Sequence, residues 1–123
     1  MDVRERGAWG ERKAANYLRL HGYRIAEMNY RCRQGEIDII AENRGFIVFA
    51  EVKLRKSERF AEAKEFVTYS KQQRIITAAQ LYLQQHETEK QPRFDVIEIY
   101  APDGENSRKI SINHIENAFE EQV

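Results

Sequence analysis

Apolar and polar residues repeat with two different periods along this chain, and the change of period separates helices from strands. Apolar positions recur every three or four residues near the N-terminus, which predicts a helix over residues 8–21. A second helix is expected from Ser70, because Ser70 and Gln73 have the spacing of a capping box and helical apolar spacing follows them. Runs rich in β-branched and aromatic residues predict a strand over residues 23–30, a hairpin over residues 35–53 and a strand over residues 94–100.

The C-terminal quarter predicts smaller elements. Pro102-Asp103-Gly104 is a turn signal, residues 110–112 predict a short edge strand, and residues 113–119 predict a terminal helical turn. The order is therefore helix, strand, hairpin, helix, strand, and a small C-terminal addition. We expect an α/β fold with a mixed sheet of about five strands flanked by helices. The hairpin should lie in its middle, with residues 94–100 parallel to a hairpin strand across the second helix.

The predicted hairpin carries charges where a covered strand usually has none. Residues 46–50 are all apolar, which is typical of a strand covered on both faces. Asp38 nevertheless lies in the middle of the first hairpin strand, and Glu51 and Lys53 lie near the end of the second. Ionised groups in such positions are costly unless they are paired or bind a metal.

The length of the hairpin turn decides whether the two carboxylates meet. A loop with an even number of residues, such as Arg44-Gly45 or residues 43–46, places Asp38 opposite Glu51, with β-carbons roughly 4.5–5.5 Å apart. A three-residue loop over residues 43–45 places Asp38 opposite Ala50 instead, unless a bulge restores the register. In the even register the carboxylates repel each other unless a cation lies between them, and Mg²⁺ is commonly held by one or two carboxylates.

Composition adds the class of protein and the compartment. The 123 residues predict a single domain over 1–123, and the one cysteine, Cys32, fits a reducing, cytoplasmic compartment. We expect no membrane partner, since neither a signal peptide nor a spanning apolar run is evident. The net charge is zero, but residues 1–83 carry 16 Lys and Arg against 11 Asp and Glu, whereas residues 84–123 carry 4 against 9. This polarity favours one basic face for a phosphate backbone, although the two halves of a sequence need not be two halves in space.

Basic residues gather near the predicted hairpin. Arg31 and Arg33 follow the first strand, where binding phosphate and forming a solvated turn are equally consistent with the sequence. Arg55 and Lys56 open a segment in which basic and aromatic residues alternate. That segment is either a loop for single-stranded or distorted nucleic acid or, over residues 60–67, a short amphipathic helix with core phenylalanines.

The charged hairpin resembles a known nuclease signature. Asp38 followed, after twelve intervening residues, by Glu51-Val52-Lys53 resembles the Asp…(Asp/Glu)-x-Lys signature of the restriction-endonuclease-like superfamily. A wider pattern over nearly the whole chain resembles the bacterial YraN-like family, which is related by fold to archaeal Holliday-junction resolvases. The matching segments are Gly10-Glu11, Ala14, Tyr17-Leu18, Gly22-Tyr23, residues 29–31, residues 35–40, residues 51–53, Lys71-Gln72, Arg74-Ile75, residues 93–96, His114-Ile115 and residues 117–119.

The resemblance implies a restriction-endonuclease-like sandwich and a role for each residue that matches. Mg²⁺ or Mn²⁺ would be held by Asp38, Glu51, the Val52 carbonyl and Glu11, with Lys53 orienting the attacking water and Gln72 assisting. For such an activity, the basic residues that we expect to track the DNA backbone are Arg31, Arg33, Arg55, Lys56 and Lys71. The activity implied is metal-dependent hydrolysis of phosphodiester bonds in DNA, with structured or branched DNA as the partner and a homodimer as in junction resolvases, although no stretch is an evident dimer seam.

Several alternatives remain open on the residues alone. Glu11 also suits the dipole at the start of the first helix or a pair with Arg31 or Arg33, and Lys71 suits solvation of a helix end. The chain also fits a non-catalytic nucleic-acid-binding module in which Glu51 and Lys53 form a structural ion pair. It further fits an interaction protein driven by its charge polarity.

Two residues that invite a catalytic interpretation are assigned structural roles. Asp95 lies near the start of a strand, where we expect it to cap the strand or pair with Arg93. His114 lies in the small C-terminal piece, which we expect it to help seat on the core.

Overall fold

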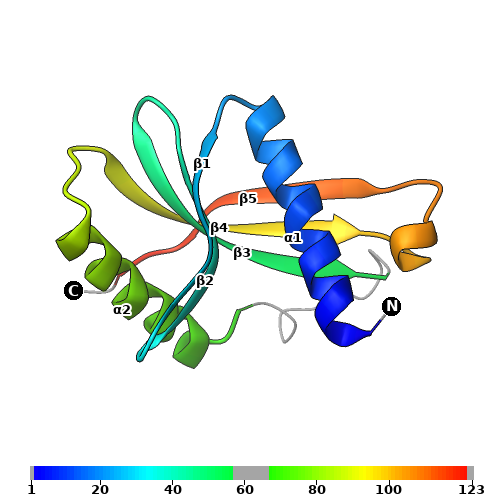
Figure 1. Cartoon of the computed structure of the whole chain (residues 1–123), viewed down its shortest axis with the longest axis horizontal. Helices are drawn as coiled ribbons and strands as arrows, with labels where there is room; N and C mark the ends of the chain where they lie inside the picture. The colour runs from blue at the N-terminus through cyan, green and yellow to red at the C-terminus, as the bar shows by residue number, and fades with distance from the viewer. Residues whose placement is uncertain (1, 57–66, 122–123) are drawn as a thin grey trace.

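The computed structural model describes residues 2–56 and 67–121 and has a mixed α/β fold (Figure 1). Two helices flank a five-stranded sheet. The elements in chain order are α1 (Val3–Leu20), β1 (Arg24–Cys32), β2 (Gly35–Glu42), β3 (Phe46–Arg55), α2 (Tyr69–Gln85), β4 (Gln91–Tyr100), the short 3-10 helix η3 (Gly104–Asn106) and β5 (Ser111–Phe119).

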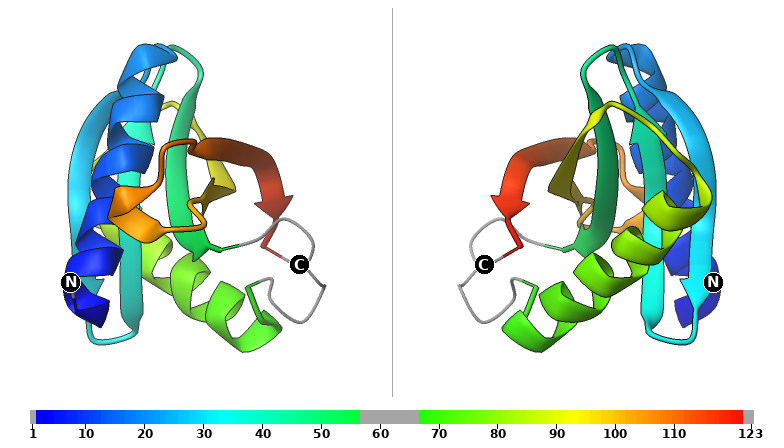
Figure 2. Two further views of the ribbon diagram at one scale, coloured as in Figure 1. Left: turned by 90° about the vertical axis from the view of Figure 1, so that its right-hand side faces the viewer. Right: turned by 90° about the vertical axis from the view of Figure 1, so that its left-hand side faces the viewer.

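The strands lie in the sheet in the same order as in the chain, from β1 to β5. Three neighbouring pairs are antiparallel, and the exception is β3 with β4, which are parallel because α2 carries the chain back between them. The mixed sheet with a hairpin strand in its middle is therefore confirmed. Figure 2 shows β1 and β5 at the two edges of this twisted sheet.

The two helices cover opposite faces of the sheet, each above its own apolar cluster. On the α1 face, Leu18 packs in a cluster with Ile39 and Val48, and in Figure 1 α1 crosses in front of β4 and β5. On the other face, Ile75 of α2 packs in a cluster with Phe49. Alternate residues of β3 thus belong to different clusters, which is why residues 46–50 are apolar without interruption.

Both helices begin earlier than the sequence predicted, and in each case a side-chain cap explains the difference. Asp2 caps α1 by accepting a 2.8 Å hydrogen bond from the Glu5 N–H, so the helix begins at Val3 and not near residue 8. Thr68 caps α2 by accepting from the Lys71 N–H at 3.2 Å. The cap predicted at Ser70 is therefore wrong, because Ser70 lies inside the first helical turn.

The C-terminal segment is a strand, so the helical turn predicted over residues 113–119 is wrong. β5 pairs with β4 along its length, and a bulge interrupts the register between the pairs Phe94–Phe119 and Val96–Ile115. Asn117 lies in this bulge with a φ of 52°. Because extra residues in the bulge separate the apolar positions Ile115 and Phe119, their spacing imitates that of a helix.

Two sequence expectations concern membranes and the segment after β3. Within the described ranges no helix is long and apolar enough to cross a lipid bilayer. The choice between a loop and a short helix over residues 60–67 concerns residues 57–66, which lie outside the described residues.

Candidate functional site

The turn between β2 and β3 places the two hairpin carboxylates opposite each other. Asn43 donates its backbone N–H to the Phe46 carbonyl at 3.1 Å, so Arg44-Gly45 is a two-residue loop. The ladder runs back through Glu42 with Ile47 as far as Ile39 with Ala50. One further step in the same register pairs Asp38 with Glu51 on one face of the sheet. The even-loop prediction is confirmed, and the three-residue alternative is wrong.

Asp38 is a partly buried carboxylate in a strongly unfavourable electrostatic environment. Its Oδ2 accepts a 2.8 Å hydrogen bond from the Val52 N–H. Burial and the negative charge of Glu51 raise the pKa of Asp38 to about 7; the Val52 hydrogen bond only partly offsets them, Glu11 adds to the rise and Lys71 opposes it. The positive charge of Lys71 is too weak to hold this carboxyl group ionised, and a cation bound beside it would restore the ionised form.

Glu51 is shared by two lysines, and the closer one comes from α2. The Oε1 atom of Glu51 lies 2.6 Å from Nζ of Lys71 and 3.8 Å from Nζ of Lys53. Burial lowers the pKa of Lys71, but the hydrogen bond and charge of Glu51 outweigh it and raise that pKa overall. Burial and the like charge of Lys71 lower the pKa of Lys53. The ion pair expected between Glu51 and Lys53 is therefore present but is the longer of the two ion pairs of Glu51. Lys71 is the main partner of Glu51.

Glu11, the third acidic residue implied at the site, comes from the opposite helix. It lies half-buried on α1, and its charge is among those that raise the pKa of Asp38 after burial and Glu51. Within residues 2–56 and 67–121, no three His, Cys, Asp or Glu side chains group closely enough to hold a metal ion. The described geometry therefore brings Asp38 and Glu51 together as a pair, and the role of Glu11 as a ligand stays a prediction.

The side-chain amide of Gln72 binds the backbone just before α2. The Nε2 group donates a 2.9 Å hydrogen bond to the Val67 carbonyl, just before the cap of α2. This bond fixes the entry of the chain into the helix that carries Lys71. A catalytic role for Gln72 stays a prediction, and the described contact is structural.

Some of the predicted DNA-binding side chains are exposed to solvent, whereas others are paired with neighbouring carboxylates. Arg33 and Lys56 are exposed. Arg31 is also exposed and lies 3.3 Å from Glu36 in a surface ion pair, which contributes little to stability. Arg55 is engaged more deeply, because its Nε lies 3.2 Å from Oε2 of the buried Glu98.

A cavity of about 600 Å³ lies between Lys71 at the start of α2 and the tip of the β1–β2 hairpin. Among the residues that the structure describes, Arg31, Lys71 and Arg74 line it, and Glu36 is the single acidic lining residue. α2 approaches this tip so closely that a Cβ on Gly35 would lie 3.0 Å from the Arg74 carbonyl oxygen. The cavity is thus a basic surface next to Glu51. Arg74 was absent from the predicted binding residues, although its position three residues after Lys71 places both on one side of a helix.

Comparison with known proteins decides the family. The sequence model of the family described as "Uncharacterised protein family UPF0102" matches residues 10–99, a span that includes Glu11, Asp38, Glu51 and Lys53. The chain belongs to the UPF0102 family. This is the YraN-like family that the sequence pattern resembles.

Three relatives in the UPF0102 family match almost end to end. A UPF0102 protein of Caldanaerobacter subterraneus subsp. tengcongensis is 45% identical over 117 residues, covering 92% of this chain and 93% of the relative. One from Syntrophomonas wolfei subsp. wolfei is 46% identical over 122 residues, covering 94% and 98%. One from Alkaliphilus oremlandii is 47% identical over 116 residues, covering 92% and 96%.

In this UPF0102 member a buried glutamate on β4 lies beside the charged residues of β3. Glu98 of β4 is the register partner of Lys53 and is 2% exposed. Besides Arg55, it accepts hydrogen bonds from the Tyr100 hydroxyl at 3.2 Å and from the Asn113 amide at 2.9 Å. Sequence reasoning missed Glu98. The available signal was a charged residue between Ile97 and Ile99 in a strand that is otherwise covered.

A second buried network fastens β5 and α1 to the start of β4. Arg93 donates to both carboxylate oxygens of Asp95 at 2.9 and 2.7 Å, which confirms the predicted pair. His114 lies 2.7 Å from Asp95 through Nε2 and 3.2 Å from the Tyr17 hydroxyl through Nδ1. Burial opposes ionisation of Asp95, but hydrogen bonds from His114, Arg93 and the Asn117 N–H outweigh it and lower its pKa. The seating role expected for His114 is confirmed.

Proposed function

We propose that this protein is a metal-dependent nuclease that hydrolyses phosphodiester bonds in DNA on a restriction-endonuclease-like fold. The observation that carries the proposal is the register of β2 and β3, which sets Asp38 opposite Glu51 with Lys53 two residues further on the same face. Glu51 and Lys53 lie in the C-terminal half of β3, the strand that is parallel to β4. In open α/β sheets, ligands commonly bind at the carboxyl ends of the strands.

Mg²⁺ or Mn²⁺ is the proposed cofactor, held by Asp38 and Glu51. Two carboxylates fit the way in which proteins hold Mg²⁺, which usually keeps several water ligands and contacts substrate phosphate. The raised pKa of Asp38 supports this assignment, because the described residues leave that carboxyl short of positive charge. Glu11 and the Val52 carbonyl are proposed as further ligands. A bound ion would lower the pKa of a water and neutralise charge developing on the phosphate.

The basic residues of the site are proposed to act in two groups. Lys53, whose pKa is lowered, would orient the attacking water or stabilise the developing charge. Lys71 would hold Glu51 in place in the resting protein and turn to phosphate when DNA and metal enter. Arg31 and Arg74 line the adjoining basic cavity and would hold the DNA backbone beyond the scissile phosphate.

The test is cleavage of branched, flapped and linear DNA in Mg²⁺, Mn²⁺ or EDTA. The proposal expects metal-dependent cleavage that falls at least about 100-fold in Asp38→Asn and in Lys53→Met. Glu42→Gln and Lys90→Met are matched controls, because those residues pair with each other near the opposite end of the hairpin. Cleavage that survives in both site variants would come from a contaminant, and absence of cleavage on every substrate and metal would remove the enzyme assignment.

A second function is favoured by the 2.6 Å contact between Lys71 and Glu51. Because this contact already neutralises Glu51, the site would also suit a non-catalytic nucleic-acid-binding module. DNA binding that weakens with salt but is unaffected by Mg²⁺, together with no heat of Mn²⁺ binding in calorimetry, would select that function over the nuclease.

A further inference from the structure

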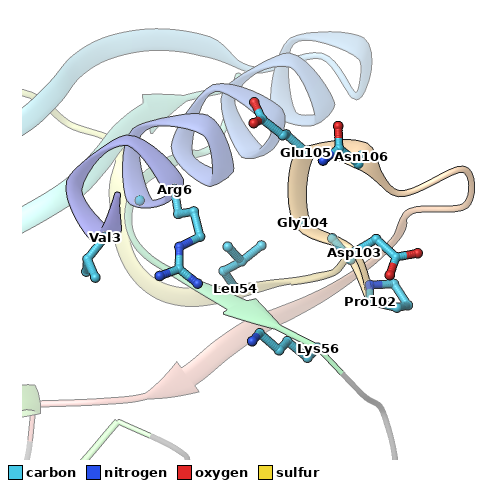
Figure 3. Close-up of a pocket in the computed structure, with 11 residues that line it drawn as sticks. Val3, Arg6, Leu54, Lys56, Pro102, Asp103, Gly104, Glu105 and Asn106 are labelled. Carbon is cyan, nitrogen blue, oxygen red and sulfur yellow. The ribbon is translucent and has the colours of Figure 1, made fainter. Parts of the chain in front are cut away.

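A second cavity lies on the face of the sheet opposite Asp38 and Glu51. It occupies about 630 Å³ between the first two turns of α1, the end of β3 and the turn that contains η3 (Figure 3). Leu54 of β3 and Lys56, the residue after the strand, line it, and Leu54 packs against the α1-side apolar cluster. Its volume falls within the range of small-molecule sites, roughly 300–1,000 Å³.

Two cationic side chains line one part of this cavity. Figure 3 shows the guanidinium of Arg6 below α1 and the Lys56 side chain beside the end of β3. The Arg6 Nε–H is buried and has no hydrogen-bond partner among the described residues. Buried donors without a partner are rare in native proteins and call for an explanation. An anion that enters beside Arg6 would supply the missing acceptor after a small rotation of this flexible side chain.

The remaining walls combine apolar surface with carboxylates. Leu54 and Pro102 give apolar contact area, and Val3, which is 77% exposed, adds to it. Asp103 and Glu105 supply acceptors from the turn across the cavity, and Figure 3 shows both away from the Arg6 guanidinium. A ligand that matches all these walls has an anionic group at one end, a flat apolar body, and hydroxyl or amino donors elsewhere.

We propose that this cavity binds a nucleotide, with its phosphate on Arg6 and Lys56 and its base against Leu54 and Pro102. The carboxylates of Asp103 and Glu105 would accept hydrogen bonds from sugar hydroxyl or base amino groups. The proposal goes beyond the nuclease function and stands without it, because Arg6, Leu54 and Pro102 have no part in the Asp38–Glu51 site; Lys56 is the one carrying residue that is also predicted to bind the DNA backbone.

Two glycines make binding directly measurable. Gly7 and Gly104 both line the cavity, and around each the position of an added Cβ meets nothing within 4 Å. Both residues therefore border open space in the cavity, and their backbone amide signals should report a ligand by nuclear magnetic resonance. We expect dAMP to shift both amide signals in a saturable way, whereas inorganic phosphate at the same concentration binds at least tenfold more weakly.

The matched variants are Arg6→Gln and Arg4→Gln. Arg4 lies exposed on the same helical turn and does not line the cavity, so its loss changes net charge equally. Arg6→Gln should raise the Kd for dAMP about tenfold or more, as expected for the loss of a charged hydrogen bond, with Arg4→Gln near wild type. An unchanged thermal midpoint would show that both variants fold. Should Arg6→Gln lose stability, Lys56→Met tests the same phosphate contact from the segment just after β3.

Four outcomes would overturn the proposal: no shift of the two glycines, equal weakening by both arginine variants, no weakening by Arg6→Gln or Lys56→Met in folded protein, or phosphate binding as tightly as dAMP. A competing single-stranded oligonucleotide separates two sources of the same chemistry. If the oligonucleotide displaces dAMP, the cavity binds one unit of a nucleic-acid strand. If dAMP stays bound, the cavity binds a free nucleotide. Either result upholds a nucleotide site. Binding of dAMP to Asp38→Asn distinguishes this site from the proposed nuclease centre.

Discussion

Lys71 of α2 lies 2.6 Å from Glu51 of β3, closer than the lysine two residues along the same strand. The contact joins a helix to the central strand of the sheet across the face that also holds Asp38. A lysine ammonium therefore occupies the position beside Glu51 where a divalent cation is proposed. Metal and Lys71 should compete for the same carboxylate.

This competition predicts that Lys71→Met binds Mn²⁺ more tightly than the wild type does. Removal of a positive charge within hydrogen-bond distance of a ligand oxygen is worth about 1–4 kcal/mol near a protein surface, so we expect about a tenfold lower Kd. Isothermal titration calorimetry at pH 7.5 would measure it, with Lys90→Met as the control. Weaker binding in Lys71→Met than in Lys90→Met would contradict the competition.

The raised pKa of Asp38 predicts a particular dependence of stability on pH. The folded protein holds this proton up to about pH 7, whereas the unfolded chain releases it near the ordinary value of 3.8. Between these values the unfolded state binds fewer protons, so a rise in pH favours unfolding. The contribution of Asp38 to the free energy of unfolding should fall between about pH 4 and pH 7, at about 1.4 kcal/mol per pKa unit and thus by up to about 4 kcal/mol.

Urea unfolding of wild type and Asp38→Asn in EDTA tests this dependence. Asparagine keeps the shape of the side chain and cannot ionise. We expect the variant to gain on the wild type as the pH rises from 4.5 to 7.5. A difference between the two proteins that stays constant over that range would show that Asp38 titrates normally.

The buried pair of Arg55 and Glu98 predicts non-additive effects on stability. Arg55→Met leaves Glu98 at 2% exposure without its cation, and a broken buried pair typically costs about 3–5 kcal/mol. Adding Glu98→Gln removes the stranded charge, so the double variant should recover part of the loss. Urea unfolding of the two single variants and the double variant gives the coupling energy. Losses that simply add would contradict a coupled pair.

The close contact between Gly35 and α2 predicts that a larger residue at this position lowers the free energy of unfolding. A Cβ at this position would lie 3.0 Å from the Arg74 carbonyl oxygen and 3.1 Å from the Arg74 Cβ, so Gly35→Ala forces helix and hairpin apart. Overpacking of this kind costs about 1–3 kcal/mol. Gly45→Ala is the matched control, because nothing lies within 4 Å of an added Cβ there. Equal unfolding midpoints for the two variants would show that the contact is loose.

Local patterns predicted the hairpin, its register and the mixed sheet. Because the residues before Glu51 are all apolar, their strand had to be covered on both faces of the sheet. Asn43 closes the two-residue turn by accepting hydrogen bonds from the N–H groups of Gly45 and Phe46 at 3.0 and 2.8 Å. The turn contacts and the hairpin pairs join residues no more than 11 positions apart in the chain, which is why sequence reasoning reached them. The mixed sheet followed from the order of the elements.

Long-range contacts account for what the sequence did not predict. The preference of Glu51 for Lys71 over Lys53 depends on where α2 docks, and the close approach at Gly35 sets that position. The strand over residues 111–119 depends on Asp95, which accepts the Asn117 N–H at 3.0 Å and so holds the bulge in β5. Neither contact leaves a periodic trace, because the partners lie 20 and 22 residues apart in the chain.

The two-residue turn at Arg44-Gly45 also controls which changes in length this protein can accept. The turn lies about 20 Å from the carboxylate pair, as judged by the rise per residue of a strand. A single inserted residue there would nevertheless turn Glu51 to the α1 face and leave Asp38 where it is. A paired insertion would lengthen the hairpin and keep both carboxylates on the α2 face. Insertions and deletions in this turn should therefore be tolerated in even numbers, and an odd one should need a compensating bulge between the turn and Asp38.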